Sequence, residues 1–346
     1  MLWIISAWWF LFPPSPNAVE RWFSRLWYRR LLDVATPLTQ SVEFPVVMGL
    51  LAAGCILFLC SWARRWIRIR RGRQCSPWAG FRWGIGSLFL ALPFVIAWFT
   101  IFWGAGYRRL PLEERLHLDT RPLSEREAEG LRDLLLGEIK RNLTPPAERE
   151  TGRAVESIAS AMAAKVGEWD GARIRLPCRV KRVPRGFLLA SGTAGVCAPF
   201  TLEALVDSGL PDTAFVYASA HELGHIAGFC GEDEASFAGY LSGLEAGDRF
   251  ARYACALNAY TDMINRLRGE EFRRAFGLLP GPAVQDLQRA EAAYRRYQIG
   301  WFRKLSWRVY NRYLQAQGVP EGVESYSRGI QLLGYAWRRG MVKGAF

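Results

Sequence analysis

Histidine is scarce in this chain, and its scarcity limits the kinds of metal site that can form. The 346 residues include three histidines. Two of them, His221 and His225, lie four positions apart, whereas His117 lies far upstream, so a centre built from three histidines is not expected. The seven cysteines include no Cys-x-x-Cys pair. A zinc site made of cysteine thiolates is therefore not expected either.

Acidic residues are too few to balance the basic ones, and the net charge is +13. The chain contains no recognisable nucleic-acid-binding motif, no internal repeat and no low-complexity tract. In the first third of the sequence the arginines flank apolar runs, an arrangement that suits anionic lipid headgroups. We therefore expect a lipid bilayer, and no nucleic acid, as a partner.

Apolar runs are concentrated in the first 107 residues, and three of them predict membrane spans. Residues 84–106 carry no charge and have about the length that a bilayer requires; Pro93 is tolerated in such a helix. Residues 44–63 form a second run. Residues 2–13 form a third, shorter run that lacks the basic start and cleavage site of a signal peptide. The alternative for each run is a buried helix of the protein core.

A basic loop between the two longer runs predicts the orientation of the chain. Short basic loops stay in the cytoplasm, so we expect a membrane region over residues 1–107 and a domain outside the cytoplasm over residues 108–346. Residues 18–35 are predicted to form an amphipathic helix, which lies in the membrane interface or packs on the exported domain. The arginines of the loop are Arg64, Arg65, Arg68, Arg70, Arg71, Arg73 and Arg82.

The remaining sequence predicts a mostly α fold with a small β-sheet. Two short runs, residues 187–190 and 196–200, are predicted to be strands around a glycine-containing turn. Four cysteines, Cys178, Cys197, Cys230 and Cys255, are either free thiols or paired in disulfides. Apolar spacing and capping signals predict helices over residues 124–143, 149–166, 212–228, 232–245, 249–268 and 284–317, and a last helix from Pro320.

The segment His221-Glu222-Leu223-Gly224-His225 predicts a metal site on a helix. Residues four apart share one helix face, so both imidazoles can reach the same ion. A catalytic zinc ion needs a third protein ligand and an open position, and here a carboxylate has to provide that ligand. Glu232 and Glu234 both lie within reach. We favour Glu232, because Ser236 follows it by one helical turn and can hydrogen-bond a histidine ligand.

Glu222 lies beside the first histidine and is the predicted general base. A bound metal ion lowers the pKa of a water molecule from about 16 to about 7, and Glu222 can then pass the proton to the leaving amine. A further donor is needed to stabilise the oxyanion, and Tyr253 and Tyr326 are the candidates. The predicted strand over residues 195–200 precedes the helix, and an extended peptide could pair with its edge.

Five short segments carry a resemblance to a known family. The chain resembles an uncharacterised bacterial family of membrane-anchored proteins of unknown function, whose exported domain is similar to zinc peptidases of the gluzincin type. This resemblance implies a zincin-like fold, zinc bound by His221, His225 and a glutamate of the fourth segment, and Glu222 as the base. Gly231 and Ser236 depart from the family pattern, which has Arg and Asn there. The segments are Phe102-Trp103-Gly104-x-x-Tyr107-Arg108-Arg109, Gly195-x-x-x-Pro199-Phe200-Thr201-x-Glu203-Ala204, His221 to His225 with Gly228-Phe229, Glu232-Asp233-Glu234-Ala235-x-Phe237, and Gly322-Val323-x-Ser325-Tyr326-x-Arg328.

We therefore expect a multi-pass protein of the bacterial cytoplasmic (inner) membrane, with an exported zinc-dependent endopeptidase domain that acts on a peptide or protein substrate. The alternative is a zinc-binding sensory or scaffold protein without turnover, but an intact Glu222 argues against it. An intramembrane protease is not expected, because the apolar stretch before His221 covers only residues 214–220 and Glu232 follows closely.

Overall fold

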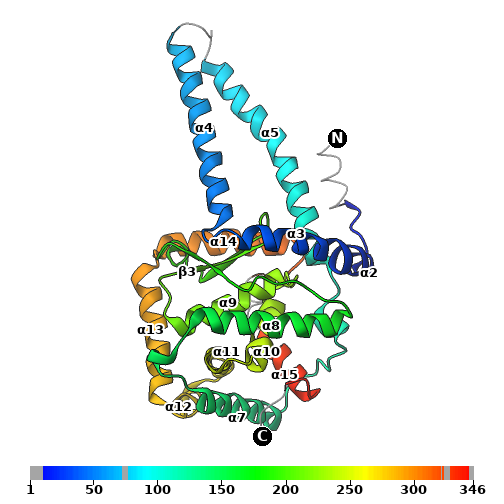
Figure 1. Ribbon diagram of the computed structural model, residues 1–346, viewed down its shortest axis with the longest axis vertical. Helices are drawn as coiled ribbons and strands as arrows, with labels where there is room; N and C mark the ends of the chain where they lie inside the picture. The colour runs from blue at the N-terminus through cyan, green and yellow to red at the C-terminus, as the bar shows by residue number, and fades with distance from the viewer. Residues whose placement is uncertain (1–10, 72–76, 321, 323–327, 343–346) are drawn as a thin grey trace.

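The computed structural model describes residues 11–71, 77–320, 322 and 328–342. The chain is mostly helical (71%) and contains a small three-stranded sheet, which confirms the predicted mostly α class with a small β component. Two long helices, α4 (Val46–Arg70) and α5 (Pro77–Phe102), leave one face of a rounded helical domain side by side (Figure 1).

Among the described residues, one helical segment is long and apolar enough to cross a bilayer. It covers Val46–Arg68 in α4, has a mean hydropathy of 2.3, and none of it is buried in the protein. In α5, the part over Leu92–Phe102 is a shorter apolar segment. Most of the third predicted span, residues 2–10, lies outside the described residues. The structure thus contains one candidate span, and a multi-pass arrangement stays a prediction.

The N-terminal segment predicted as an amphipathic helix is helical and packs on the domain. It forms α2 (Pro16–Ala18), the π-helical η1 (Val19–Trp27) and α3 (Tyr28–Gln40). Tyr28 and Leu32 are buried, and the Tyr28 hydroxyl donates to the Ile226 carbonyl over 2.9 Å. The opposite surface is apolar but exposed, since Trp22 and Leu26 are 60% and 47% accessible. Of the two predicted positions for this segment, the structure shows packing on the domain.

The sheet has the order β1-β3-β2. Its strands are β1 (Lys181–Val183), β2 (Gly195–Ala198) and β3 (Glu203–Asp207). β3 pairs in parallel with β1 and antiparallel with β2, with Gly195 opposite Val206. β2 is therefore an edge strand, as predicted, although it ends before residue 200. The strand predicted over residues 187–190 is wrong: the Asp207 carboxylate accepts backbone N–H groups there and holds a turn.

Two central helices, α9 (Asp212–Ile226) and α10 (Glu232–Glu245), form the core of the domain, and most of their residues are buried. The other helices and the sheet surround them (Figure 1). The predicted helices at residues 124–143, 149–166, 232–245 and 249–268 are present within a few residues. The remaining elements are η2 (Gly104–Arg108), α6 (Leu112–Arg115), α7 (Glu125–Asn142), η3 (Pro146–Glu148), α8 (Thr151–Asp170), η4 (Leu189–Ser191), α11 (Arg249–Ile264), α12 (Gly269–Gly277), α13 (Gly281–Tyr297), α14 (Gly300–Ala316) and α15 (Gly329–Arg338).

The single helix predicted over residues 284–317 is instead two helices. The Ile299 N–H donates to the Ala190 carbonyl over 3.0 Å, so this residue leaves the helical hydrogen-bond pattern and α14 begins at Gly300. As a result α14 runs along the face that carries α4 and α5, while α13 runs down the side of the domain (Figure 1). The hydrogen bond that sets this break is non-local, and the local sequence does not contain its signal.

Small residues allow α9 and α10 to approach each other closely. A Cβ atom on Gly224 would lie 2.7 Å from the Ala235 carbonyl oxygen, and one on Gly239 would lie 3.2 Å from the His221 backbone nitrogen. The first distance leaves no room for a side chain, and the second is shorter than ordinary van der Waals contact. The short connection between the helices includes Gly228, whose φ of +96° is unfavourable for other residues.

We predict that Gly224→Ala separates α9 from α10 and lowers the free energy of unfolding by about 1–3 kcal/mol, the usual cost of overpacking. Thermal unfolding of the full chain in detergent would measure the loss. Gly277→Ala is the matched control: it changes the last residue of α12, where nothing lies within 4 Å of the added methyl group. Equal stability of the two variants would contradict the close approach.

A buried ion-pair network fastens the N-terminal helices to the domain. The Arg109 guanidinium contacts Glu20 of η1 at 2.6 Å and Asp170, at the end of α8, at 3.2 Å. Arg29 and Arg115 also pair with Asp170. Burial opposes ionisation of Asp170, but the three guanidinium groups outweigh it and hold its pKa below the ordinary value. Asp170 therefore stays charged and joins three segments that are distant in sequence.

We predict that Asp170→Asn destabilises the full chain by about 3–5 kcal/mol, because it leaves buried arginines without their partner. Since the folded pKa is lowered, the carboxylate stabilises the fold above its unfolded pKa of about 4, and this stabilisation is lost as the pH falls through the folded pKa. The melting temperature of Asp170→Asn should therefore fall less steeply on acidification than that of the unaltered chain. Glu270→Gln, in an exposed pair with Arg274, should change little; a similar effect of both substitutions would refute the role of the network.

Candidate metal centre

Three buried side chains meet at the interface between α9 and α10. His221, His225 and Glu232 each present a possible ligand atom, and these atoms all lie within 4.8 Å of one another. The Nε2 atoms of the two imidazoles are 3.0 Å and 3.4 Å from the same Glu232 oxygen, Oε2. The helical spacing puts both imidazoles on one face of α9, and Glu232, the first residue of α10, folds back onto them. We call these three residues the cluster.

The other ring nitrogen of each histidine has a partner that fixes the orientation of the imidazole. The Nδ1–H of His225 donates to the Phe229 carbonyl over 2.8 Å, and Nδ1 of His221 is 3.1 Å from Ser236 Oγ. Both Nε2 atoms consequently point toward the centre of the cluster. Metal-binding histidines are usually held in this way. The sequence analysis favoured Glu232 because Ser236 could hydrogen-bond a histidine, and this contact is present.

Charge and burial act together within the cluster. Burial opposes ionisation of Glu232, but the two imidazoles outweigh it and hold its pKa below the ordinary value. Burial also disfavours the charged form of His225, yet the Glu232 carboxylate raises the pKa of His225 to about 9. A divalent cation at this place would replace a proton as the positive charge between these groups.

Glu222 lies next to the cluster, and its side chain is closely packed. Its side chain is almost completely buried, and within the described part of the chain its Oε2 atom has no hydrogen-bond partner. Gly195 of the edge strand β2 lies against it, since a Cβ atom on Gly195 would be 2.7 Å from Glu222 Oε1. Burial raises the pKa of the Glu222 carboxyl above its ordinary value. Glu222 is thus a carboxylate with unused acceptor capacity and increased basicity.

Glu234 does not join the cluster. Its carboxylate points to the other side of α10, where it accepts the Leu112 N–H over 2.8 Å. Burial and the neighbouring Asp233 raise the pKa of Glu234 to about 7, although Arg115 and Arg109 oppose this. Of the two glutamates that the sequence left open, the structure therefore brings Glu232 to the histidines.

Of the two tyrosines predicted as oxyanion donors, Tyr253 lies within the described residues and is engaged elsewhere. The Tyr253 hydroxyl donates to Asp286 Oδ2 over 2.7 Å, and Asp286 also forms a buried ion pair with Arg149. This network holds α11 to α13, so Tyr253 has a structural partner away from the cluster. Tyr326 lies outside the described residues.

Four aromatic side chains that the sequence analysis did not identify cover the cluster instead. We call them the aromatic roof: Trp103, Tyr107, Tyr310 and Tyr313. Tyr310 of α14 donates its hydroxyl hydrogen to Glu232 Oε1. Tyr313 stacks on Tyr310 and hydrogen-bonds to the Tyr107 hydroxyl over 3.2 Å. The indole of Trp103, at the end of α5, meets the ring of His225 edge-on, with centroids 6.1 Å apart. Trp103 and Tyr107 lie in a segment of the family resemblance, whereas no sequence signal distinguishes Tyr310 and Tyr313 from the other tyrosines.

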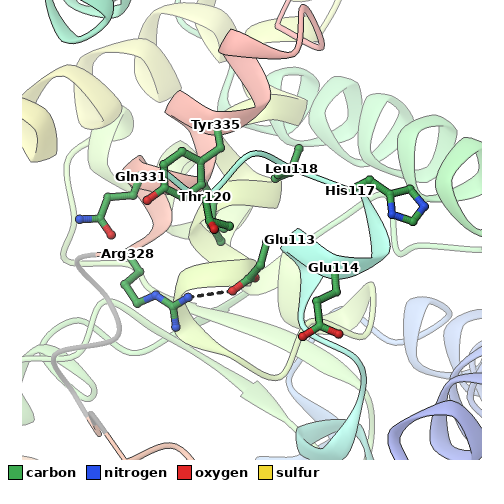
Figure 2. Close-up of a pocket in the computed structure, with 9 residues that line it drawn as sticks. Glu113, Glu114, His117, Leu118, Thr120, Arg328, Gln331 and Tyr335 are labelled. Carbon is green, nitrogen blue, oxygen red and sulfur yellow. Dashed lines mark hydrogen bonds and ion pairs between the residues drawn. The ribbon is translucent and has the colours of Figure 1, made fainter. Parts of the chain in front are cut away.

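The third histidine belongs to a different place. Figure 2 shows a pocket of about 660 Å³ that is lined by His117, Glu113, Glu114 and Arg328, among others. Arg328 spans from Glu113, at 2.9 Å, to Asp233, at 3.5 Å. Arg328 thus connects the pocket to the start of α10, and His117 lines this pocket and is not part of the cluster.

The cysteines of the described residues are free thiols. Cys178 is exposed, Cys197 is half-buried, and Cys230 and Cys255 are buried. Burial raises the pKa of Cys255 to about 12, so this thiol is protonated and unreactive. Of the two alternatives for the four domain cysteines, the structure supports free thiols.

A known family profile matches residues 23–334, from η1 to α15. This family is described as "Protein of unknown function (DUF3810)". The chain belongs to the DUF3810 family. The predicted membership in an uncharacterised family is therefore confirmed, whereas the zinc-peptidase character of DUF3810 stays a prediction. No curated protein and no solved structure matches the chain.

We predict that Ser236→Ala weakens the binding of a divalent metal by about 10–100-fold, because the His221 imidazole loses the partner that orients it. Competitive titration of the metal-free chain with a zinc chelator would measure the affinity. Ser242→Ala is the matched control, since Ser242 is a buried serine of the same helix without a hydrogen-bond partner among the described residues. If both variants bind zinc equally, Ser236 does not orient the imidazole.

Proposed function

We propose that this chain is a membrane-anchored, zinc-dependent peptidase with a zincin-like domain. One observation carries the proposal: two imidazole nitrogens and one carboxylate oxygen lie within 4.8 Å of one another, with the free acceptor of Glu222 beside them. Two nitrogens and one oxygen are a ligand set that catalytic zinc sites use, with one position left for water or substrate.

The residues fit a divalent ion for three reasons. The cluster is buried, its histidines are oriented from behind, and its carboxylate is held in the charged form. Two imidazole nitrogens with a carboxylate oxygen favour zinc over magnesium or calcium, which prefer oxygen ligands. When bound, zinc would act as a Lewis acid that polarises a carbonyl group and makes water a better nucleophile.

Glu222 is the proposed general base. Its buried carboxylate has a raised pKa, and a base whose pKa is closer to neutrality transfers protons more effectively. It would take a proton from the attacking water molecule and deliver it to the nitrogen of the leaving amine. Because Gly195 packs against it, the carboxylate lies between α9 and the edge strand.

The edge strand β2 is the proposed binding site for the peptide. β2 forms its described strand pairing with β3, so its other edge can pair with an extended substrate. Gly195 contacts the base at the start of this strand, which would bring the backbone of a bound peptide next to Glu222. This arrangement favours peptide bonds over other hydrolysable bonds.

Tyr310 replaces Tyr253 as the proposed oxyanion donor, and Tyr326 stays a predicted candidate. The Tyr310 hydroxyl hydrogen-bonds to a cluster oxygen, and a phenol at this position can turn toward a developing oxyanion. In doing so, it would exchange its hydrogen bond to Glu232 for one to the oxyanion.

We further propose that α4 and α5 form a multi-pass anchor in the bacterial cytoplasmic membrane. The last part of α4 carries Arg64, Arg65, Arg68 and Arg70, and this end of the helix is far from the domain (Figure 1). Basic loops remain in the cytoplasm. The domain would accordingly lie outside the cytoplasm, where the peptide or protein substrate is met.

We predict that Glu222→Gln keeps stoichiometric zinc but lowers peptide hydrolysis by at least about 10²-fold, because the amide cannot accept the proton. Elemental analysis and cleavage of a peptide library by the purified full chain would measure both properties. His221→Ala should lose zinc and hydrolysis together.

Two outcomes would contradict the proposal. Retained cleavage in Glu222→Gln would show that the base is wrongly assigned. Stoichiometric zinc in the unaltered chain without cleavage of any library peptide would instead favour a zinc-binding protein without turnover.

A further inference from the structure

The outer surface of α14 carries two parallel stripes of side chains. Trp301, Leu305 and Val309 are spaced four residues apart and are 69%, 48% and 61% exposed. The second stripe is basic and also exposed, and it consists of Lys304, Arg308 and Arg312. Residues four apart share one helix face. An exposed apolar stripe beside a basic one is typical of a helix that lies in a membrane interface.

The inner surface of the same helix packs on the cluster. Tyr310 and Tyr313 point inward and form part of the aromatic roof, and Leu314 is fully buried. α14 therefore already has a buried face, and its exposed apolar residues form a second, separate face. α14 has one face that covers the cluster and another face that has no cover among the described residues.

The N-terminal helices extend this exposed surface. Trp22 of η1 is 60% exposed, and Val34 and Leu38 of α3 are 64% and 66% exposed. Arg21, Arg25 and Arg30 are exposed beside them. α3 and α14 lie at the same level of the molecule, on the face from which α4 and α5 leave the domain (Figure 1). Tryptophan and arginine together are enriched where proteins meet lipid headgroups.

The root of α4 fixes where this face lies relative to a bilayer. The backbone N–H groups of Val46 and Val47 donate to the carboxylate of Glu203, on β3, over 2.9 Å. The apolar span begins at Val46 itself. No spacer therefore separates the domain from the span, and the face at the root of α4 has to lie against the headgroups of the leaflet that α4 enters.

We propose that η1, α3 and the outer surface of α14 are seated in the interfacial layer of that leaflet, with the basic stripe bound to anionic lipid phosphates. The occupant of this surface is the bilayer and not a second copy of the chain, because the surface is continuous with the root of the candidate span and its exposed charges are basic except for Asp33. The proposal requires that α4 crosses a bilayer, but it does not depend on a metal or on hydrolysis. Its consequence is that the aromatic roof over the cluster rests on lipid.

A photo-crosslinking experiment on the full chain in nanodiscs containing phosphatidylglycerol tests this proposal. p-Benzoylphenylalanine would replace Trp301 or Val309 on α14, Leu57 on α4 as the lipid-embedded reference, and Leu278 as the control. Leu57 is 68% exposed and Leu278 is 55% exposed. Leu278 follows α12, at the end of the domain far from α4 (Figure 1). Mass spectrometry would identify the adducts at each position.

We expect lipid adducts at positions 301 and 309 that are comparable to those at position 57, and none above background at position 278. Adducts at 57 but not at 301 and 309 would overturn the proposal while α4 remains a span. Adducts of 301 or 309 with protein, including a second copy of the chain, would overturn it as well. Absence of lipid adducts at 57 would remove both the span and the proposal. None of these outcomes bears on the assignment of Glu222.

Discussion

The close contact between α9 and α10 is the constraint on which the candidate site depends. Gly224 lets the two backbones approach to a distance at which a Cβ atom would not fit, and at Gly239 a Cβ atom would be in tight contact. At that separation the first residue of α10, Glu232, meets two imidazoles that helical geometry has already placed on one face of α9. If the helices were farther apart, the three ionisable groups would be buried without polar partners, which would destabilise the fold.

Around this contact the protein stabilises buried charge in two different ways. In the cluster, the carboxylate of Glu232 is stabilised by imidazoles, which a cation can also bind. On the other side of α10, arginines stabilise Glu20 and Asp170, and no open ligand position results. Arg109 joins the two regions, because it packs against the Phe229 ring, while the Phe229 carbonyl orients His225. The N-terminal helices and the cluster are thus parts of one packed unit.

The position of α14 links the cluster to the side of the domain from which α4 and α5 leave. One hydrogen bond, from Ile299 to Ala190, ends the preceding helix and directs α14 across the cluster. The inner side of α14 then provides Tyr310, and its outer side provides an apolar and a basic stripe. Any molecule that reaches Glu232 therefore has to pass α14. α14 itself lies on the face of the domain from which α4 leaves.

The sequence by itself determined what is local. The spacing of His221 and His225, the choice of Glu232 with Ser236 one turn later, the edge strand before α9 and the apolar run of α4 all follow from the periods of helices and strands. Tertiary structure decided what depends on distant segments. Tyr310 meets Glu232 across 78 residues, Glu234 turns toward Leu112 across 122 residues, and Tyr253 is engaged by Asp286. The sequence analysis did not predict β1 and β3, which are stabilised by their pairing with other strands. Periodicity describes a side chain relative to its own helix or strand, whereas these contacts depend on which other segment packs against it.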